Sequence, residues 1–181
     1  MKRTYLFTSA RLGFREWEAG DIDKLAAINA DADVMEFFPS VKTWEETAEF
    51  IDRMQKQMSS KGYCYYAVDA LENGDFIGFI GLCDQTYEAS FTPCVDIGWR
   101  LAKHAWGNGY ATEGAKRCLE YGLNELGLAR IVAVAPTANV RSEQVMKNAG
   151  MQKVAEFIHP LLVNDERLRD CVLYEIIPTT L

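Results

Sequence analysis

The chain has 181 residues, 49% of them hydrophobic and 25% charged, which is typical of one soluble globular domain. Its 26 acidic residues outnumber its 19 basic ones, giving a net charge of −7, and this balance argues against nucleic acid as a partner. Because no stretch reaches roughly 18 apolar residues and the N-terminus lacks the apolar segment of a secretory signal, we expect a cytoplasmic protein with no membrane partner.

The first third of the chain predicts one strand followed by helices. Weak alternation of apolar residues predicts a strand over 9–17, and an apolar stripe with helical spacing predicts a helix over 20–30. Residues 31–39 predict one more short helical turn, which a proline ends. Residues 43–62 open with a Thr-x-x-Glu capping box and close on a glycine, so a long helix is expected there.

The rest of the chain mixes strands with two further helices. Residues 63–70 and 75–84 predict two strands, and the Asn-Gly pair between them predicts a tight hairpin turn. A strand, a helix, a strand, a helix and two strands are then expected over 94–102, 110–127, 129–136, 140–150, 151–158 and 169–177. The order β-α-α-β-β-β-α-β-α-β-β predicts an α+β fold, with a mixed, mostly antiparallel sheet of about seven strands flanked by about four helices.

The cysteines and histidines lack the spacing of metal ligands. No C-x-x-C pair occurs, and neither His104 nor His159 lies at a ligand spacing from a cysteine. We therefore expect no metal site and no disulfide framework. Buried free thiols are the expected state of Cys64, Cys83, Cys94, Cys118 and Cys171.

A glycine-containing turn, "GNGYATEG" at 107–114, lies between a predicted strand and a predicted helix. A Walker loop is excluded because no Lys-Ser/Thr pair follows the glycines, and a dinucleotide fingerprint is excluded because Thr112 stands in place of its third glycine. Gly107 and Gly109 instead allow backbone N–H groups at a helix N-terminus to converge on an anion. A tight turn with no ligand remains the alternative.

Several segments match, in chain order, the signature of a known enzyme family. The run "HAWGNG" at 104–109 matches the acetyl-CoA motif Q/R-x-x-G-x-G/A at both glycines and departs from it at His104. The segments "VDIGWRLAKHAWGNGYATEG", "PTANVRSEQVMKNAGM" and "DCVLYEI" extend the match over nearly the whole chain. On these residues the chain resembles the GNAT acetyltransferases, and among them the RimJ/RimL protein N-terminal acetyltransferases. The resemblance implies a single GNAT domain over 1–181.

In GNAT enzymes the strand before this turn splays from its neighbour, and the pantetheine arm of acetyl-CoA fills the gap. The resemblance therefore implies that acetyl-CoA binds with its pantetheine beside the backbone of 99–101 and its pyrophosphate on the N–H groups of 107–111. It also implies that Asn139 hydrogen-bonds the pantetheine. The implied cofactor-binding residues are Trp99, Arg100, Leu101, His104, Gly107, Asn108, Gly109, Tyr110, Ala111, Asn139 and Ser142.

Three residues are candidates for the chemistry that the resemblance implies. Ser142, in the family's N-x-x-S motif, would protonate the departing CoA thiolate, although it and Asn139 equally suit a helix cap. The base that accepts the amine's proton would be Asp96, on the strand where the family places a carboxylate, or His159, whose ordinary pKa suits base chemistry near neutral pH. A structural role also stays open for each of these two residues.

The resemblance implies an N-acetyltransferase that transfers an acetyl group directly to a primary amine, either of a peptide N-terminus or of a small molecule. The alternative is a non-catalytic acyl-CoA-binding or regulatory module with the same fold. The expected partners are acetyl-CoA and the amine acceptor, and dimerisation within the family allows a homodimer. Four aromatic residues fall where the family forms its acceptor cleft, although a core role suits most of them: Trp17, Phe37, Phe38 and Trp44.

Overall fold

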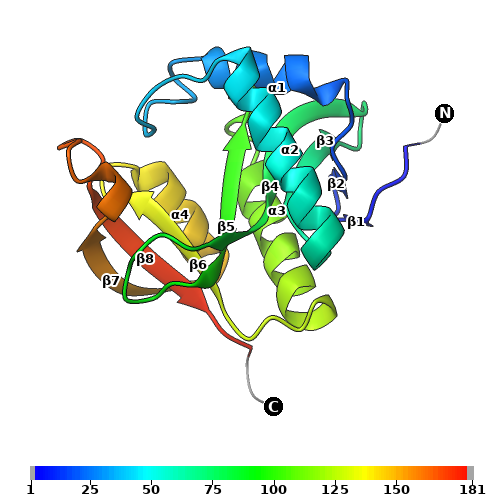
Figure 1. Ribbon diagram of the computed structural model, residues 1–181. Helices are drawn as coiled ribbons and strands as arrows, with labels where there is room; N and C mark the ends of the chain where they lie inside the picture. The colour runs from blue at the N-terminus through cyan, green and yellow to red at the C-terminus, as the bar shows by residue number, and fades with distance from the viewer. Residues whose placement is uncertain (1–2, 179–181) are drawn as a thin grey trace.

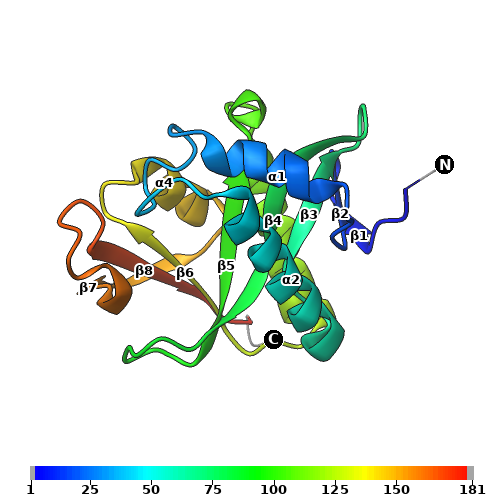
Figure 2. The same cartoon turned by 45° about the horizontal axis from the view of Figure 1, so that its top comes forward.

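An eight-stranded mixed sheet forms the centre of the protein, and the computed structural model describes residues 3–178 (Figures 1 and 2). The strand order is β1-β2-β3-β4-β5-β6-β8-β7, and every neighbouring pair is antiparallel except the parallel pair β5 and β6. The strands are β1 (Phe7–Thr8), β2 (Leu12–Arg15), β3 (Tyr65–Ala70), β4 (Asp75–Gln85), β5 (Cys94–Leu101), β6 (Ile131–Pro136), β7 (Gln152–Ile158) and β8 (Asp170–Ile176).

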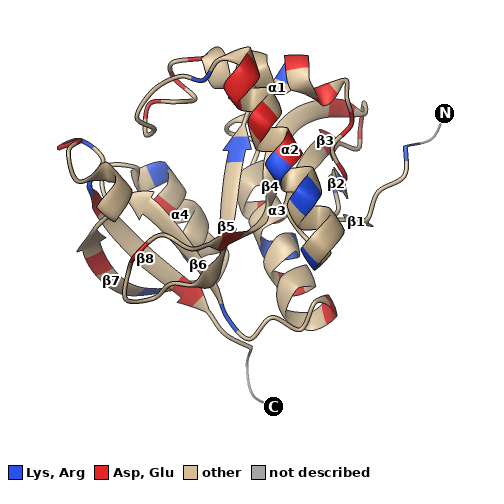
Figure 3. Ribbon diagram, in the orientation of Figure 1, with Lys and Arg blue, Asp and Glu red and all other residues tan. Residues whose placement is uncertain are grey.

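Four helices cover the sheet, with α1 and α2 over one face of its first half (Figure 2). Acidic and basic residues are interspersed along α2 (Figure 3). Within residues 3–178 no helix is both long and apolar enough to span a membrane. The helices are α1 (Asp21–Ala30), α2 (Trp44–Lys61), α3 (Tyr110–Glu120) and α4 (Val140–Asn148), with short turns of 3-10 or π helix at Lys103–Ala105, Tyr121–Glu125 and Pro160–Leu162.

The predicted α+β fold and the order of its main elements are confirmed, with two departures. Strand β1 adds an eighth strand, whose two residues are too few to leave a periodic signal in the sequence. Residues 31–39 form successive turns instead of a helix. The reason is local: the Asp31 carboxylate accepts the Asp33 N–H at 2.9 Å, and such a bond competes with the helical hydrogen bonds.

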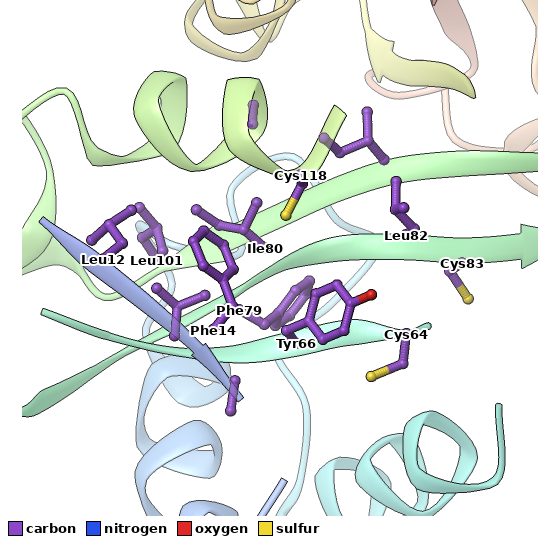
Figure 4. Close-up of a cluster of buried hydrophobic side chains, with 14 of the residues drawn as sticks. Leu12, Phe14, Cys64, Tyr66, Phe79, Ile80, Leu82, Cys83, Leu101 and Cys118 are labelled. Atoms are coloured by element: carbon purple, nitrogen blue, oxygen red, sulfur yellow. The ribbon is translucent and has the colours of Figure 1, made fainter. Parts of the chain in front are cut away.

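Helix α3 packs closely on the sheet because a glycine faces it. A Cβ built on Gly114 would lie 2.3 Å from Cδ1 of Ile80 and 3.2 Å from Cδ1 of Leu12. In the same layer Cys118 of α3 lies near Ile80 and Leu82 of β4, and all three side chains are buried (Figure 4). Burial of each such Leu or Ile contributes roughly 1.5–3 kcal/mol. This packing fixes the position of α3, which begins shortly after β5 ends.

The five cysteines are free thiols, four of them buried and Cys94 partly exposed. Burial raises the pKa of Cys83 to about 12 and that of Cys171 to about 11. These thiols therefore stay protonated near neutral pH, where a thiol is a poor nucleophile.

The sheet opens between β5 and β6. Strand β4 pairs with the whole length of β5, from Gln85 opposite Cys94 to Gly78 opposite Leu101. Strand β6, in contrast, bridges β5 at a single position, where Asp96 lies opposite Val132. Beyond this bridge the two strands diverge, as Figures 1 and 2 show, and the free edge of β5 faces the gap.

Candidate active site

A cavity of about 380 Å³ lies at the wide end of the gap between β5 and β6. The loop between α1 and α2, the end of β5, the glycine turn and the first residues of α3 and α4 line it. Most of the residues that the sequence motifs single out for acetyl-CoA meet here. Those among the lining residues are Trp99, Arg100, Leu101, Gly107, Gly109, Tyr110, Ala111, Asn139 and Ser142.

The glycine turn has a backbone that other residues adopt only with strain. Gly107 and Gly109 have φ angles of 76° and 77°, and a Cβ built on Gly107 would meet nothing within 4 Å beyond its chain neighbours. Gly109 is the N-cap of α3, and no side chain caps that helix. The N–H groups of its first turn, with the positive end of the helix dipole, are therefore available to a ligand. The Asn108 amide does not line the cavity and instead donates to the carbonyls of Ala105 and Trp106, each at 3.2 Å.

Successive residues of β5 direct their backbone groups to opposite sides. The Arg100 carbonyl faces β4, since a Cβ built on Gly78 would lie 2.1 Å from that oxygen. The Leu101 carbonyl faces away from β4 and accepts the indole N–H of Trp106 at 2.9 Å. Trp99 shares this orientation, so its backbone faces the gap. The Arg100 backbone, which is expected to lie beside the pantetheine, thus faces β4, and its guanidinium stacks on Phe38, another residue that lines the cavity.

Helix α4 begins at the cavity with the N-x-x-S motif. Asn139 is its N-cap, and the Asn139 side-chain oxygen accepts the Ser142 N–H at 3.1 Å. Both residues also line the cavity. The helix-cap role and a position beside a ligand are thus compatible for Asn139.

The loop between α1 and α2 is tied to both flanks of the cavity. Asp33 pairs with Lys103, and Glu36 pairs with Arg141 at 3.1 Å. The Arg141 guanidinium also stacks over Trp106, 5.0 Å from its ring centroid. Because exposed ion pairs contribute about 0–1 kcal/mol each, these contacts hold the loop only weakly.

Asp96 lies at the narrow end of the gap, outside the lining of the cavity. Its carboxylate accepts hydrogen bonds from the Tyr65 hydroxyl at 2.6 Å and from the Gln85 amide at 3.1 Å. Burial raises the pKa of Asp96 to about 6, although both hydrogen bonds act in the opposite direction. Asp96 and Arg100 share one face of β5, since they are four residues apart, or about 13 Å along the strand.

Neither histidine lines this cavity. His159 precedes a 3-10 turn, where its Nδ1 accepts the Leu161 N–H at 3.2 Å and its ring packs against Tyr87 with centroids 4.6 Å apart. Burial lowers the pKa of His159. His104 lines a separate, open hollow. Within residues 3–178 no group of three or more His, Cys, Asp or Glu side chains is arranged to hold a metal ion.

Sequence reasoning did not identify Arg141 as part of the site. Its position inside the N-x-x-S motif, one residue before Ser142, could have indicated that it lies at the site. Of the four aromatic residues assigned to the region of the acceptor cleft, Phe37 and Phe38 line the cavity. Trp17 is buried in the core, whereas Trp44 is exposed and lies neither in the core nor in the lining of the cavity.

Residues 11–152 match the family model described as "Acetyltransferase (GNAT) domain". The uncharacterized N-acetyltransferase YnaD of Bacillus subtilis is 30% identical over 151 residues, which cover 83% of this chain and 84% of that relative. A GNAT-family acetyltransferase structure from Bacillus anthracis has a TM-score of 0.78 at 29% identity, covering 94% of this chain and 96% of that one. A spermidine N-acetyltransferase from Vibrio cholerae, solved with CoA and spermine, shares the fold, with a TM-score of 0.74 at 18% identity and coverage of 93% and 96%. The chain therefore belongs to the GNAT acetyltransferase family and is an N-acetyltransferase.

Proposed function

We propose that the protein transfers an acetyl group directly from acetyl-CoA to a primary amine, in the manner of the RimJ/RimL-like branch. The acceptor is a peptide N-terminus or a small molecule. One observation carries the proposal: within residues 3–178, β5 and β6 pair at a single position, Asp96 with Val132, and the cavity at their open end adjoins the glycine turn. A free strand edge beside an uncapped helix N-terminus suits an extended ligand that has amide groups along its length and phosphates at one end.

The residues around the gap fit acetyl-CoA. The open surface above Gly107 and the first-turn N–H groups of α3 suit the pyrophosphate, because backbone donors and the helix dipole both favour an anion. The outward-facing backbone of Trp99 suits an amide of the pantetheine arm. Asn139 uses its oxygen as the cap of α4, which leaves its NH₂ group to donate to the same arm.

Acetyl-CoA supplies the thioester carbonyl that the amine attacks. Ser142, at the start of α4, donates a proton to the departing thiolate. Asp96 accepts, through water, the proton that the amine must lose. A carboxylate with a pKa of about 6 is mostly ionised at neutral pH and more basic than an ordinary aspartate, which suits this role.

Asp96 is a better candidate for the base than His159. Asp96 lies on β5 at the narrow end of the gap, in line with the strand edge that leads to the cavity. His159 lies beyond β7, and its Nδ1 is occupied by the Leu161 N–H. The imidazole therefore serves here to cap a short turn.

The test combines binding with turnover. Calorimetry is expected to show saturable binding of acetyl-CoA, and a thiol-reactive dye is expected to show CoA release with at least one amine. The acceptor panel contains peptides with varied N-termini, amino acids, polyamines and aminoglycosides. The proposal is contradicted by the absence of saturable binding at millimolar acetyl-CoA, or by binding without thiol release across the panel.

A further inference from the structure

Arg100 is a cation held among aromatic rings at the edge of the cavity. Its guanidinium lies 4.2 Å from the ring centroid of Phe38 and 5.3 Å from that of Phe79. Its Nε is buried and makes no hydrogen bond within residues 3–178. Its Nη1 donates to the Asn29 amide oxygen at 2.7 Å, but a neutral amide does not balance the charge.

Arg15, which is almost fully buried, shows how this fold otherwise compensates such a charge. Arg15 contacts the carboxylates of Asp21 and Asp69 at 2.6 and 2.8 Å, and all three side chains are almost fully buried. Arg100, in contrast, has no carboxylate within 4 Å in the described part of the chain. Burial lowers the pKa of Arg100 to about 10. A guanidinium that packs between aromatic rings with no carboxylate partner, and whose Nη2 makes no hydrogen bond within residues 3–178, is a site that an anionic ligand would complete.

The position of Arg100 limits which ligand supplies the anion. Arg100 lines the cavity together with Phe38, on which its guanidinium stacks, and its side chain lies on the face of β5 that also carries Asp96. In the proposed acetyl-CoA complex the pyrophosphate lies on the glycine turn at 107–111, and the pantetheine arm beside Trp99 has no charge. The remaining 3′-phosphate belongs to the ribose, on the far side of the pyrophosphate from the pantetheine. The acceptor amine, which must come within reach of Asp96, is the component left to carry the anion to this face.

We infer that Arg100 binds a carboxylate of the acceptor, so that the substrate is an amine that also bears a carboxylate, such as an amino acid or a short peptide. This inference rests on the proposed function. The guanidinium can donate to a carboxylate from Nη2, which makes no hydrogen bond within residues 3–178, while Phe38 and Phe79 keep water from competing for it. A polyamine is disfavoured, because it would bring a second cation beside Arg100.

The test compares acceptors that differ only in their anion. Glycine, γ-aminobutyrate and alanylalanine are each assayed against the corresponding carboxamide, with spermidine as the polycation. In the unmodified protein kcat/KM is expected to favour the carboxylate by about 10- to 100-fold, the range of a charge-assisted hydrogen bond. Arg100→Met removes this preference, and Arg100→Lys retains part of it.

Arg141→Met is the matched control, because Arg141 also lines the cavity but is paired with Glu36. It is expected to keep the carboxylate preference. Acetyl-CoA affinity, measured by calorimetry, is expected to change less than threefold in Arg100→Met. An unchanged preference in Arg100→Met, no preference in the unmodified protein, spermidine as the best acceptor, or a large loss of acetyl-CoA affinity would each overturn the inference.

A binding measurement separates this inference from the proposed function. N-acetylglycine and N-acetylglycinamide are titrated in the presence of CoA, with the fluorescence of Trp99 and Trp106 as the signal, since both line the cavity. Tighter binding of the acid that Arg100→Met abolishes supports the carboxylate site even if no amine is turned over. Equal binding of the two compounds contradicts it even if turnover is found. Arg100→Lys, which keeps the charge and most of the side-chain volume, serves if Arg100→Met does not fold.

Discussion

Asp96 and Val132 form the only bridge between β5 and β6 in the part of the chain that the structure describes. Strand β5 pairs with β4 from Cys94 to Leu101, whereas β5 and β6 separate from this bridge toward the cavity and the glycine turn. A partly buried carboxylate with a raised pKa therefore lies at the vertex of the gap that the acyl donor is proposed to fill. This relationship makes Asp96 the residue whose substitution tests the proposed chemistry most directly.

Asp96→Asn is expected to lower kcat/KM by about 100-fold or more, because the proton acceptor is lost. The unmodified protein is expected to show activity that rises with pH through an apparent pKa near 6, and this limb is expected to be absent from the residual activity of the variant. His159→Gln serves as the comparison, since it removes the other candidate base. If His159→Gln loses the limb while Asp96→Asn keeps it, the roles assigned here are wrong.

The same carboxylate makes stability depend on pH. The pKa of Asp96 in the fold, about 6, lies above the ordinary value of about 3.9 expected in the unfolded chain, so the fold favours the protonated form. Its contribution is therefore greatest below pH 4 and is lost as pH rises through 6. Asp96→Asn removes this loss, so the stability of the variant relative to the unmodified protein is expected to rise by on the order of 2 kcal/mol between pH 4 and pH 7. Urea unfolding at four pH values measures it, and parallel curves for the two proteins would contradict the assignment.

The elements that could be predicted from sequence depend on contacts within one segment. The capping box of α2 is one such case, since Thr43 and Glu46 satisfy each other's backbone N–H groups across a single turn. Residues 31–39 could not be predicted in this way. The sequence predicts one more short helical turn there, but the Asp31 carboxylate accepts a nearby N–H and turns the chain.

In the site, too, the features that could be predicted are those contained in one segment of the sequence. The glycine turn and the N-x-x-S motif are contiguous in sequence, and the structure brings both to one cavity. The hydrogen bond from the Tyr65 hydroxyl to Asp96 depends on how β3, β4 and β5 pair, because the two residues are 31 positions apart in the sequence. Whether Arg100 offers its backbone or its side chain depends likewise on the register of β4 and β5, which places its carbonyl against Gly78. Neither the hydrogen bond to Asp96 nor the orientation of Arg100 can be predicted from sequence motifs.

The glycine turn can be tested against a turn with the same backbone elsewhere. Gly107, Gly109 and Gly74 have φ angles of 76°, 77° and 75°, so alanine at each position is expected to cost about 1 kcal/mol of stability. Only Gly107→Ala and Gly109→Ala are expected to weaken acetyl-CoA binding, by about tenfold, because their methyl groups would stand between the phosphates and the backbone donors. Chemical denaturation and calorimetry measure the two effects. An equal loss of affinity in Gly74→Ala would show that strain, not position, is responsible.

Asn139 is proposed to have two roles, and substitutions can separate them. Asn139→Ala is expected to destabilise the protein by about 1 kcal/mol, as the loss of an N-cap does, and to weaken acetyl-CoA binding. Thr43→Ala removes the cap of α2, so it is expected to match the first effect without the second.

Asn139→Asp is the decisive variant. Aspartate caps a helix as well as asparagine, so the stability is expected to remain within about 0.5 kcal/mol of that of the unmodified protein. It lacks the NH₂ donor, however, and so cannot hydrogen-bond a pantetheine carbonyl. Acetyl-CoA affinity is therefore expected to fall in Asn139→Asp as far as in Asn139→Ala, although only the alanine variant is destabilised. Normal affinity in the aspartate variant would show that Asn139 acts on the ligand only through the cap of α4.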